Sequence, residues 1–225
     1  MATILENVQG VKARIARAAR AAGRDPESVT LLAVSKTHPV ARVAEAQTAG
    51  LRAFGENYVQ EALQKMPLVS GVEWHLIGAL QSNKSRLAAE RFDWVQTVDR
   101  VRIANRLSEQ RPAHLPPLNV LIEVNISGEA SKSGVAVKEV TALGAAIAHL
   151  SRLRLRGLMA IPAPGAGGDF AKMKQLYEEL RGRFGFDTLS MGMSDDMEQA
   201  IAAGATMVRI GTAIFGARRT EESPA

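Results

Sequence analysis

Short apolar runs alternate along the chain with longer segments of helical periodicity. We distinguish eight runs that are rich in β-branched or apolar residues and have the length of strands. They span Val29–Ser35, Leu51–Gly55, Glu73–Ile77, Asp93–Val98, Leu118–Asn125, Leu153–Ile161, Thr188–Met191 and Thr206–Ile210. Apolar residues at three- and four-residue spacing predict helices between these runs, near residues 39–50, 56–66, 82–91, 100–110, 135–149, 168–184 and 194–203, and a further helix near 2–22.

Eight successive strand–helix units predict a closed parallel sheet surrounded by helices. We therefore expect an α/β protein, a single (β/α)8 TIM barrel with an extra N-terminal helix; a doubly wound open sheet is the alternative. No linker marks a second domain, so we expect one domain over residues 1–216 and a flexible C-terminal tail at 217–225. The stretch PAPGAGGD at 162–169 is expected to be a mobile loop at the functional rim.

The helix expected after the seventh strand carries its own start and stop signals. Ser194 can cap the first backbone N–H groups, and Asp195 and Asp196 suit the positive end of the helix dipole. Gly204 is suited to end the helix.

The composition argues against several kinds of site. The chain has no cysteine, which rules out a disulfide or a thiolate metal site and is typical of a reducing compartment, so we expect a cytoplasmic protein. The four histidines lie far apart without HExxH-type spacing, and we expect no metal site. No stretch approaches the roughly 20 apolar residues that cross a bilayer, and the N-terminus lacks a signal-type apolar region, so we expect no membrane association.

The net charge of +5 raises the question of nucleic-acid binding, because Arg14, Arg17 and Arg20 recur along the first predicted helix. Aromatic residues make up only 4% of the chain, which leaves little for base stacking, and no nucleic-acid-binding motif accompanies the arginines. A solvated basic helix face is the favoured interpretation, and we expect no nucleic-acid partner.

Residues able to bind a ligand gather at the predicted carboxyl ends of the strands, where barrel proteins hold their ligands. They are Lys36, Glu56, Asn57, His75, Asn125, Ser190, Met191, Arg209, Gly211 and Thr212. Lys36 directly follows LLAVS, so its amine would lie where an apolar strand opens into the barrel mouth; partial desolvation there lowers a lysine pKa and favours attack on an aldehyde. Position alone favours the simpler interpretation that Lys36 is the first solvated residue after a strand.

Arg209 interrupts the otherwise buried run TMVRIG, and a guanidinium cannot lose its charge there. It requires a polar partner, which could be a pyridine nitrogen, a phosphate, a carboxylate or a structural salt bridge. Gly211 and Thr212 then open a short terminal helix whose N–H groups could seat a phosphate, with Ser190 and Ser194 supplying hydroxyl donors.

Seven segments together resemble the pyridoxal 5′-phosphate (PLP) homeostasis protein family, of the YggS/PROSC type. They are LLAVSKTHPV, FGENYVQEALQK, WHLIGALQSNKSR, TVDR, IEVNISGEASKSG, GLMAIP and LSMGMSDDMEQAIAAGATMVRIGTAIFG. The resemblance extends from the first helix to Phe215, and its most specific parts are VSK around Lys36 and the block at 189–216. It implies a fold-type III PLP-binding barrel like the N-terminal domain of alanine racemase.

The resemblance also assigns cofactor contacts. It implies that Lys36 is the Schiff-base lysine, that Arg209 faces the pyridine nitrogen, and that Ser190, Gly211 and Thr212 contact the phosphate. An arginine in that position keeps the nitrogen largely unprotonated, which makes the cofactor a poorer electron sink.

Four further positions follow from the same comparison. Asn57 and His75 match residues that line the cofactor pocket, and Lys132 matches a second lysine associated with PLP in relatives, although an exposed loop lysine remains an equal alternative. Ala79 stands where we expect proline after WHLIG; it is expected to loosen that loop without touching a cofactor residue.

The family implies a monomeric PLP carrier or regulator without turnover of its own, with PLP, amines or amino acids and PLP-dependent apoenzymes as partners. The alternatives are an amino-acid racemase-like enzyme and a phosphate-binding barrel enzyme without PLP. Racemisation needs acid/base groups on both faces of the substrate, and Lys36 supplies one. In alanine racemases a tyrosine of a C-terminal domain supplies the other; only about 15 residues follow the eighth strand here, so we expect no such domain. Tyr58 and Tyr177 are expected on helices, which leaves His75 as the remaining candidate.

Overall fold

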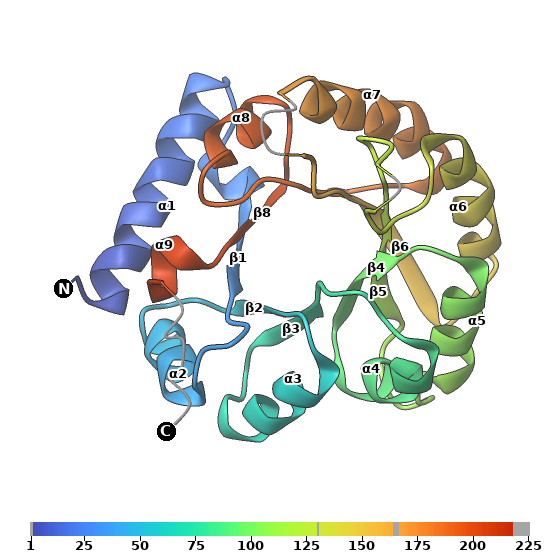
Figure 1. Cartoon of the computed structure of the whole chain (residues 1–225), viewed down its shortest axis with the longest axis horizontal. Helices are drawn as coiled ribbons and strands as arrows, with labels where there is room; N and C mark the ends of the chain where they lie inside the picture. The colour runs from blue at the N-terminus through green and yellow to red at the C-terminus, as the bar shows by residue number, and fades with distance from the viewer. Residues whose placement is uncertain (1, 130, 164–166, 218–225) are drawn as a thin grey trace.

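Eight parallel strands close into a barrel in chain order, with β8 paired to β1 (Figure 1). The computed structural model describes residues 2–129, 131–163 and 167–217. The strands are β1 (Thr30–Val34), β2 (Ala53–Glu56), β3 (Glu73–Leu76), β4 (Trp94–Val98), β5 (Leu118–Glu123), β6 (Leu153–Met159), β7 (Thr188–Ser190) and β8 (Met207–Ile210). Each of the eight predicted runs overlaps a strand, so the predicted (β/α)8 barrel is confirmed and the open doubly wound sheet was the wrong alternative.

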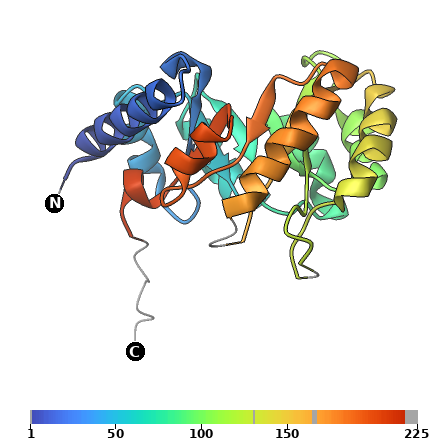
Figure 2. The same cartoon turned by 90° about the horizontal axis from the view of Figure 1, so that it is seen from above.

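Helices form a ring around the barrel (Figures 1 and 2). They are α1 (Ile4–Ala21), α2 (Val40–Thr48), α3 (Val59–Lys65), α4 (Ser85–Arg91), α5 (Val101–Gln110), α6 (Val140–Ala148), α7 (Gly167–Phe184), α8 (Met197–Ala202) and α9 (Thr212–Phe215). Short 3-10 turns occupy Pro26–Ser28, Met66–Leu68, Ser82–Lys84 and Val137–Glu139. Within the described ranges, no helix is both long enough and apolar enough to cross a membrane.

The extra N-terminal helix α1 is the predicted one, and it packs outside the barrel against α8 and α9. Thr3 and Glu6 form a capping box at its start, which satisfies backbone N–H groups of the first turn. Arg14 donates to Glu198 of α8 from Nε at 2.8 Å and from Nη2 at 3.0 Å. One of the three arginines of the predicted basic helix face therefore has a partner within the fold.

Three local predictions differ from the structure. Helix α8 begins at Met197, and Ser194 does not cap it; Asp196 instead accepts a hydrogen bond from the Met193 N–H through its side chain. Glu56 is the last residue of β2 and is buried, because β2 runs on past Gly55. In the stretch 162–169, expected to be a loop, α7 already begins at Gly167; residues 164–166 lie outside the described residues, as does the tail from 218 onwards.

Close approach of β6 and β7 requires glycine at position 157. The pairing of β5 with β6 shifts register between Val120 and Leu121, and Gly157 has a φ of 153°. A Cβ atom on Gly157 would lie 1.8 Å from the carbonyl oxygen of Thr188 in β7, which no side chain can occupy. Gly157 therefore allows β6 and β7 to approach closely, beside the register shift between β5 and β6.

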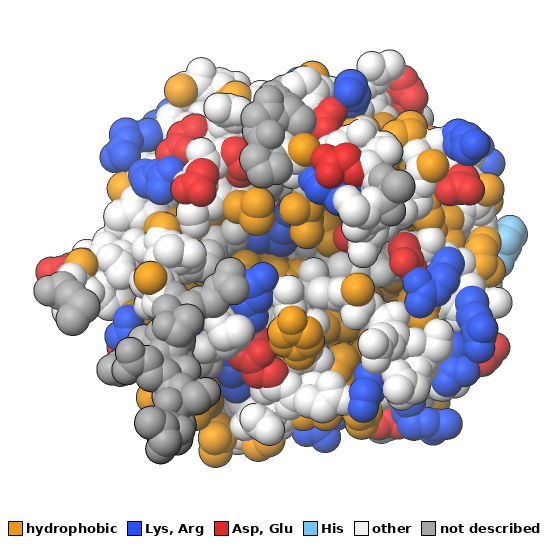
Figure 3. Space-filling view, viewed as in Figure 1, with side chains coloured by type: hydrophobic (Ala, Val, Ile, Leu, Met, Phe, Trp, Pro, Cys, Tyr) orange, Lys and Arg blue, Asp and Glu red, His pale blue; other side chains and the backbone are white. Residues whose placement is uncertain are grey.

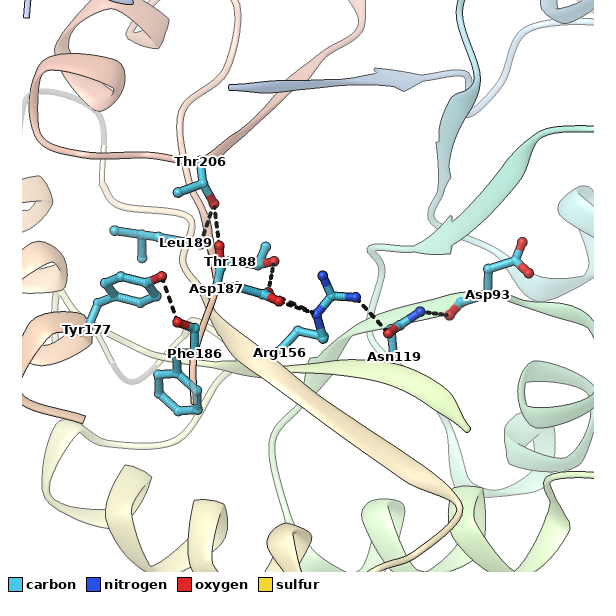
Figure 4. A network of polar contacts seen from close by, with 9 residues as sticks. All are labelled: Asp93, Asn119, Arg156, Tyr177, Phe186, Asp187, Thr188, Leu189 and Thr206. Carbon is cyan, nitrogen blue, oxygen red and sulfur yellow. Dashed lines mark hydrogen bonds and ion pairs between the residues drawn. The ribbon is translucent and has the colours of Figure 1, made fainter. Parts of the chain in front are cut away.

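Paired polar groups close the amino-terminal end of the barrel (Figure 4). Arg156 of β6 donates from Nε to both carboxylate oxygens of Asp187 at 2.8 Å, and from Nη1 to Asn119 Oδ1 at 2.9 Å. Its guanidinium carbon lies 4.7 Å from the centre of a Trp94 ring. We call Arg156, Asp187, Asn119 and Trp94 the barrel floor.

Candidate functional site

The opposite end of the barrel, where the strands end, carries most of the predicted ligand-binding residues. Figures 1 and 3 look onto this face, and the space-filling view shows a hollow at its centre with basic side-chain atoms at the bottom. Lys36 lies half-buried in the turn after β1, Asn57 directly follows β2, and Gly211 directly follows β8. Residues that are far apart in the sequence thus meet at one barrel mouth, as parallel strand ends must.

Arg209 is buried beneath this mouth without a carboxylate partner. Its side chain in β8 is only 4% exposed; Nη1 donates to Ser190 Oγ and Nη2 to the Ala160 carbonyl, both at 2.8 Å. No ion pair includes Arg209 within the described ranges, so the structural salt bridge is not its role there. Burial lowers the pKa of Arg209 to about 10, against the opposing effect of Asp196 and Glu123, and the guanidinium stays charged at neutral pH.

A chain of hydrogen bonds runs from Arg209 into the barrel interior. Ser190 Oγ donates to Gln96 Oε1 at 2.7 Å, which leaves the Gln96 amide nitrogen to donate to His75 Nδ1 at 2.9 Å. His75 stacks on Trp94 with ring centroids 5.0 Å apart, and its Nε2 lies 3.9 Å from Glu73 Oε2, too far for a hydrogen bond. Burial lowers the pKa of His75 more than Glu73 raises it, so the ring is neutral.

This chain of hydrogen bonds gives Ser190 and His75 partners within the protein. The hydroxyl proton of Ser190 goes to Gln96 and its oxygen accepts a hydrogen bond from Arg209, so this side chain holds Arg209. Its contact with a phosphate stays a prediction. His75 is fully buried beside Trp94 of the floor, next to the last residue of β3, and its place in the cofactor pocket stays a prediction. Gln96 was missed by the sequence reasoning; its signal is an amide in the middle of the buried run DWVQTV.

Glu123 is a second titratable group that the sequence reasoning missed. It ends β5, is 7% exposed, and burial raises its pKa to about 7. The carboxylate of Asp99 adds to this rise, and the guanidinium of Arg209 opposes it. The carboxyl group of Glu123 therefore gains or loses its proton near neutral pH, and it lies close enough to Arg209 for the guanidinium charge to lower its pKa.

Asn57 lies at the rim of the mouth, in contact with the β3–α4 connection. A pocket of about 370 Å³ is lined by Asn57, Tyr58, Gly78, Ala79 and Lys84 among others. A Cβ atom on Gly78 would lie 2.2 Å from the Asn57 carbonyl oxygen, so glycine is required for this approach. Ala79, which was expected to touch no predicted cofactor residue, lines the same pocket as Asn57.

Gly211 and Thr212 form the start of the four-residue helix α9. The first bond of this helix runs from the Ile214 N–H to the Gly211 carbonyl at 2.9 Å, so the N–H groups of Thr212 and Ala213 precede it. A Cβ atom on Gly211 would lie 3.2 Å from the Val34 carbonyl of β1. Phe215 stacks on His38 at a centroid distance of 5.0 Å, which ties α9 to the turn that carries Lys36.

Lys132 lies in the connection after β5. Its Nζ donates to the Ile161 carbonyl at 3.3 Å and lies 3.5 Å from Glu129 Oε1. These contacts hold it against the connection after β6. Among the residues described, no group of three or more His, Asp or Glu side chains is placed to hold a metal ion.

Comparison with known sequences places the chain in a family. The model of the alanine racemase N-terminal domain matches residues 7–219. The pyridoxal phosphate homeostasis protein of Pseudomonas aeruginosa is 60% identical over 225 residues, covering 97% of each chain. Its counterpart from Escherichia coli K12 is 59% identical over 229 residues, covering 97% of this chain and 98% of the relative.

Solved structures show the same fold. PipY of Synechococcus elongatus, solved with PLP bound, has a TM-score of 0.82 and 34% identity, covering 95% of this chain and all of its own. Alanine racemase of Corynebacterium glutamicum has a TM-score of 0.72 at 17% identity and shares the fold over 98% of this chain and 63% of its own. The family match over nearly the whole chain and the high identity of full-length relatives agree, and the protein belongs to the pyridoxal phosphate homeostasis protein family, with the alanine racemase N-terminal barrel as its domain.

Proposed function

We propose that this protein binds PLP at the barrel mouth, with the cofactor joined to Lys36 as a Schiff base, and that it serves in PLP homeostasis as a carrier. The observation that carries the proposal is Arg209: its charged guanidinium is buried beneath the mouth and, among the residues that the structure describes, hydrogen-bonds to a hydroxyl and a carbonyl only. Burying a charge in that position costs free energy unless a bound ligand interacts with the charge and offsets the cost. The relatives bear PLP homeostasis in their names, and PipY was solved with PLP bound.

The residues of the mouth fit such a cofactor by type. Lys36 supplies the amine, Arg209 would face the pyridine nitrogen, and Gly211 and Thr212 would offer backbone N–H groups and a hydroxyl to the phosphate. Asn57 would line the rim. PLP supplies a reactive aldehyde and a ring that withdraws electrons from a bound amine.

The chain's own groups act by holding and orienting. A fixed positive charge at Arg209 disfavours a proton on the neighbouring nitrogen, which weakens electron withdrawal and suits a carrier that must avoid side reactions. Ser190 and Gln96 keep the guanidinium in place. We extend the proposal to free amines and PLP-dependent apoenzymes as the partners that receive PLP from Lys36.

We also propose that the protein has no useful racemase activity. Both tyrosines are poorly suited as a second acid/base group: Tyr177 donates its hydroxyl to the Phe186 carbonyl on the outside of the barrel, and Tyr58 is 62% exposed at the rim. His75 lies below the mouth and is bound to Gln96. Solvent-deuterium incorporation at Cα of L- and D-alanine should stay far below about 1 per second; a rate of that order, lost in Lys36→Ala, would favour the racemase instead.

The absorption spectrum of the PLP-treated protein tests the binding proposal. The wild type should show a visible band that borohydride removes, and Lys36→Ala should lack it. Lys132→Ala is the matched control, because Lys132 is the other lysine singled out for PLP and should leave the band unchanged. An equally strong reducible band in Lys36→Ala would contradict the assignment.

A further inference from the structure

The ammonium of Lys65, near the end of α3, is buried directly behind the turn that carries Lys36. Its Nζ donates to the Ser35 carbonyl at 2.8 Å, to Glu56 Oε1 at 2.7 Å and to Glu61 Oε1 at 2.7 Å. An ammonium has three N–H donors, so these bonds use all of them. One of the three acceptors belongs to the residue immediately before Lys36.

The same group reaches the residue immediately after Lys36 through Glu61. Glu61 Oε1 also accepts a hydrogen bond from the Thr37 backbone N–H at 2.5 Å. Thr37 has a φ of 64°, a left-handed conformation that is uncommon for a β-branched residue and that costs on the order of 1 kcal/mol or more. The Glu61 contact thus fixes a turn that Thr37 would not readily adopt by itself.

The third member of the cluster, Glu56, is fully buried at the end of β2. Ser35 Oγ donates to its Oε1 at 2.6 Å, and in the described part of the chain its Oε2 has no hydrogen-bond partner. Burial raises the pKa of Glu56, and the Lys65 ammonium opposes that rise. Buried ion pairs are often no more stable than apolar residues of the same size, so stability is a weak reason for keeping this one.

Bonds from one cluster hold the residues on both sides of Lys36. We propose that Lys65, with Glu61 and Glu56, positions Lys36 for bond formation with an aldehyde by fixing the backbone of residues 35–37. This inference rests on the proposed role of Lys36 and assigns a positioning function to three residues outside the cofactor contacts. Without the cluster, the turn would have to be ordered each time an aldehyde binds, and ordering one residue costs about 1–2 kcal/mol.

Glu61 offers the cleanest test, because its side chain is 22% exposed and its loss should leave the fold intact. Glu61→Ala removes the acceptor of the Thr37 N–H, whereas Glu61→Gln retains an oxygen there. We expect Glu61→Ala to weaken the PLP–Lys36 adduct roughly 10-fold in a titration of the visible band, and Glu61→Gln to stay within about 3-fold of the wild type. Glu178→Ala, an exposed glutamate on α7 paired with Arg181, is the matched control.

Pyridoxine 5′-phosphate distinguishes positioning from general damage, because it carries the ring and phosphate but no aldehyde. Its affinity should change less than about 2-fold in Glu61→Ala. Equal weakening of both ligands, or no weakening of PLP, would overturn the inference. A double variant, Lys65→Met with Glu56→Gln, removes the buried charges together and should reproduce the selective loss of PLP, with circular dichroism reporting the fold.

The titration of the wild type distinguishes failure of this inference from failure of the proposed PLP binding at Lys36. If the wild type forms no adduct on Lys36, the proposed function fails first. If the wild type forms it and Glu61→Ala forms it equally well, the positioning role alone is wrong.

Discussion

The two ends of the barrel each hold a strand arginine, and the two arginines differ in their binding partners. Arg156 at the floor binds both oxygens of Asp187, the Asn119 amide and the face of Trp94. Arg209 beneath the mouth is more deeply buried and hydrogen-bonds to Ser190 and a carbonyl, with no carboxylate partner among the described residues. The floor satisfies its charge within the protein, whereas the charge at the mouth is the one that we propose for a ligand.

The neighbouring carboxyl groups follow the same division. Asp187 at the floor is paired with Arg156, so its charge has a partner at 2.8 Å. Glu123 at the mouth has a pKa raised to about 7, because burial outweighs the attraction of Arg209. Unbalanced charge at one end of a barrel is therefore a better indication of a binding site than the mere presence of charged residues.

Replacement of the two arginines by methionine should separate these roles most strongly at the mouth. Arg209→Met removes the charge that we assign to the cofactor ring, and we expect PLP affinity to fall roughly 1,000-fold, about 4 kcal/mol. Without PLP, the free energy of unfolding of Arg209→Met should differ from that of the wild type by less than about 1 kcal/mol, because the variant also loses the cost of burying that charge. Titration of the visible band and urea unfolding measure the two quantities; an affinity within about 10-fold of the wild type would remove Arg209 from the site.

The charge state of Glu123 should appear as a pH dependence of stability. Between its ordinary pKa of 4.5 and about 7, the folded state keeps a proton that the unfolded state has lost. The free energy of unfolding contributed by this group therefore falls as pH rises through that range, by up to about 3 kcal/mol, and stays low above it.

Glu123→Gln cannot ionise and should lack this fall. Urea unfolding of the PLP-free protein at about pH 4.5, 6 and 8 compares the variant with the wild type, and Glu178→Gln on exposed α7 serves as the control. Parallel pH profiles of the wild type and Glu123→Gln would show that Glu123 is ionised in the folded protein like an exposed carboxyl.

Arg156→Met should have the converse effect to Arg209→Met. It breaks a bidentate pair and leaves Asp187 without its partner, so we expect a loss of about 2 kcal/mol in the free energy of unfolding, a moderate value because Arg156 is partly exposed. PLP affinity should stay within about 3-fold. A large loss of PLP binding with unchanged stability would abolish the distinction between floor and mouth.

The fold was largely predictable from the sequence, because strand and helix periods are local properties. Each of the eight runs was long enough to show its apolar period, and errors were confined to ends such as Glu56, which was predicted to follow the second strand but lies in β2. The predicted start of α8 was wrong because Ser194 is one of several residues there that could cap a helix. Hydrogen bonding, not residue type, decides among them.

The site was predictable in position but not in its supporting contacts. Lys36 and Gly211 could be placed because strand ends in a barrel share one face. The bonds of Ser190 to Gln96 and Arg209 could not be predicted, because these partners lie 94 and 19 residues away in the chain. The contact of Lys65 could not be predicted either, because its acceptor, the Ser35 carbonyl, lies 30 residues earlier in the chain.

The central claim is that PLP is bound covalently at Lys36, and reductive trapping tests it most directly. The PLP-treated protein is reduced with borohydride, digested, and its peptides are mapped by mass spectrometry. The account predicts the pyridoxyl group on the peptide that contains Lys36, with little on any other lysine. Modification mainly at Lys132, or spread evenly over the exposed lysines, would contradict it.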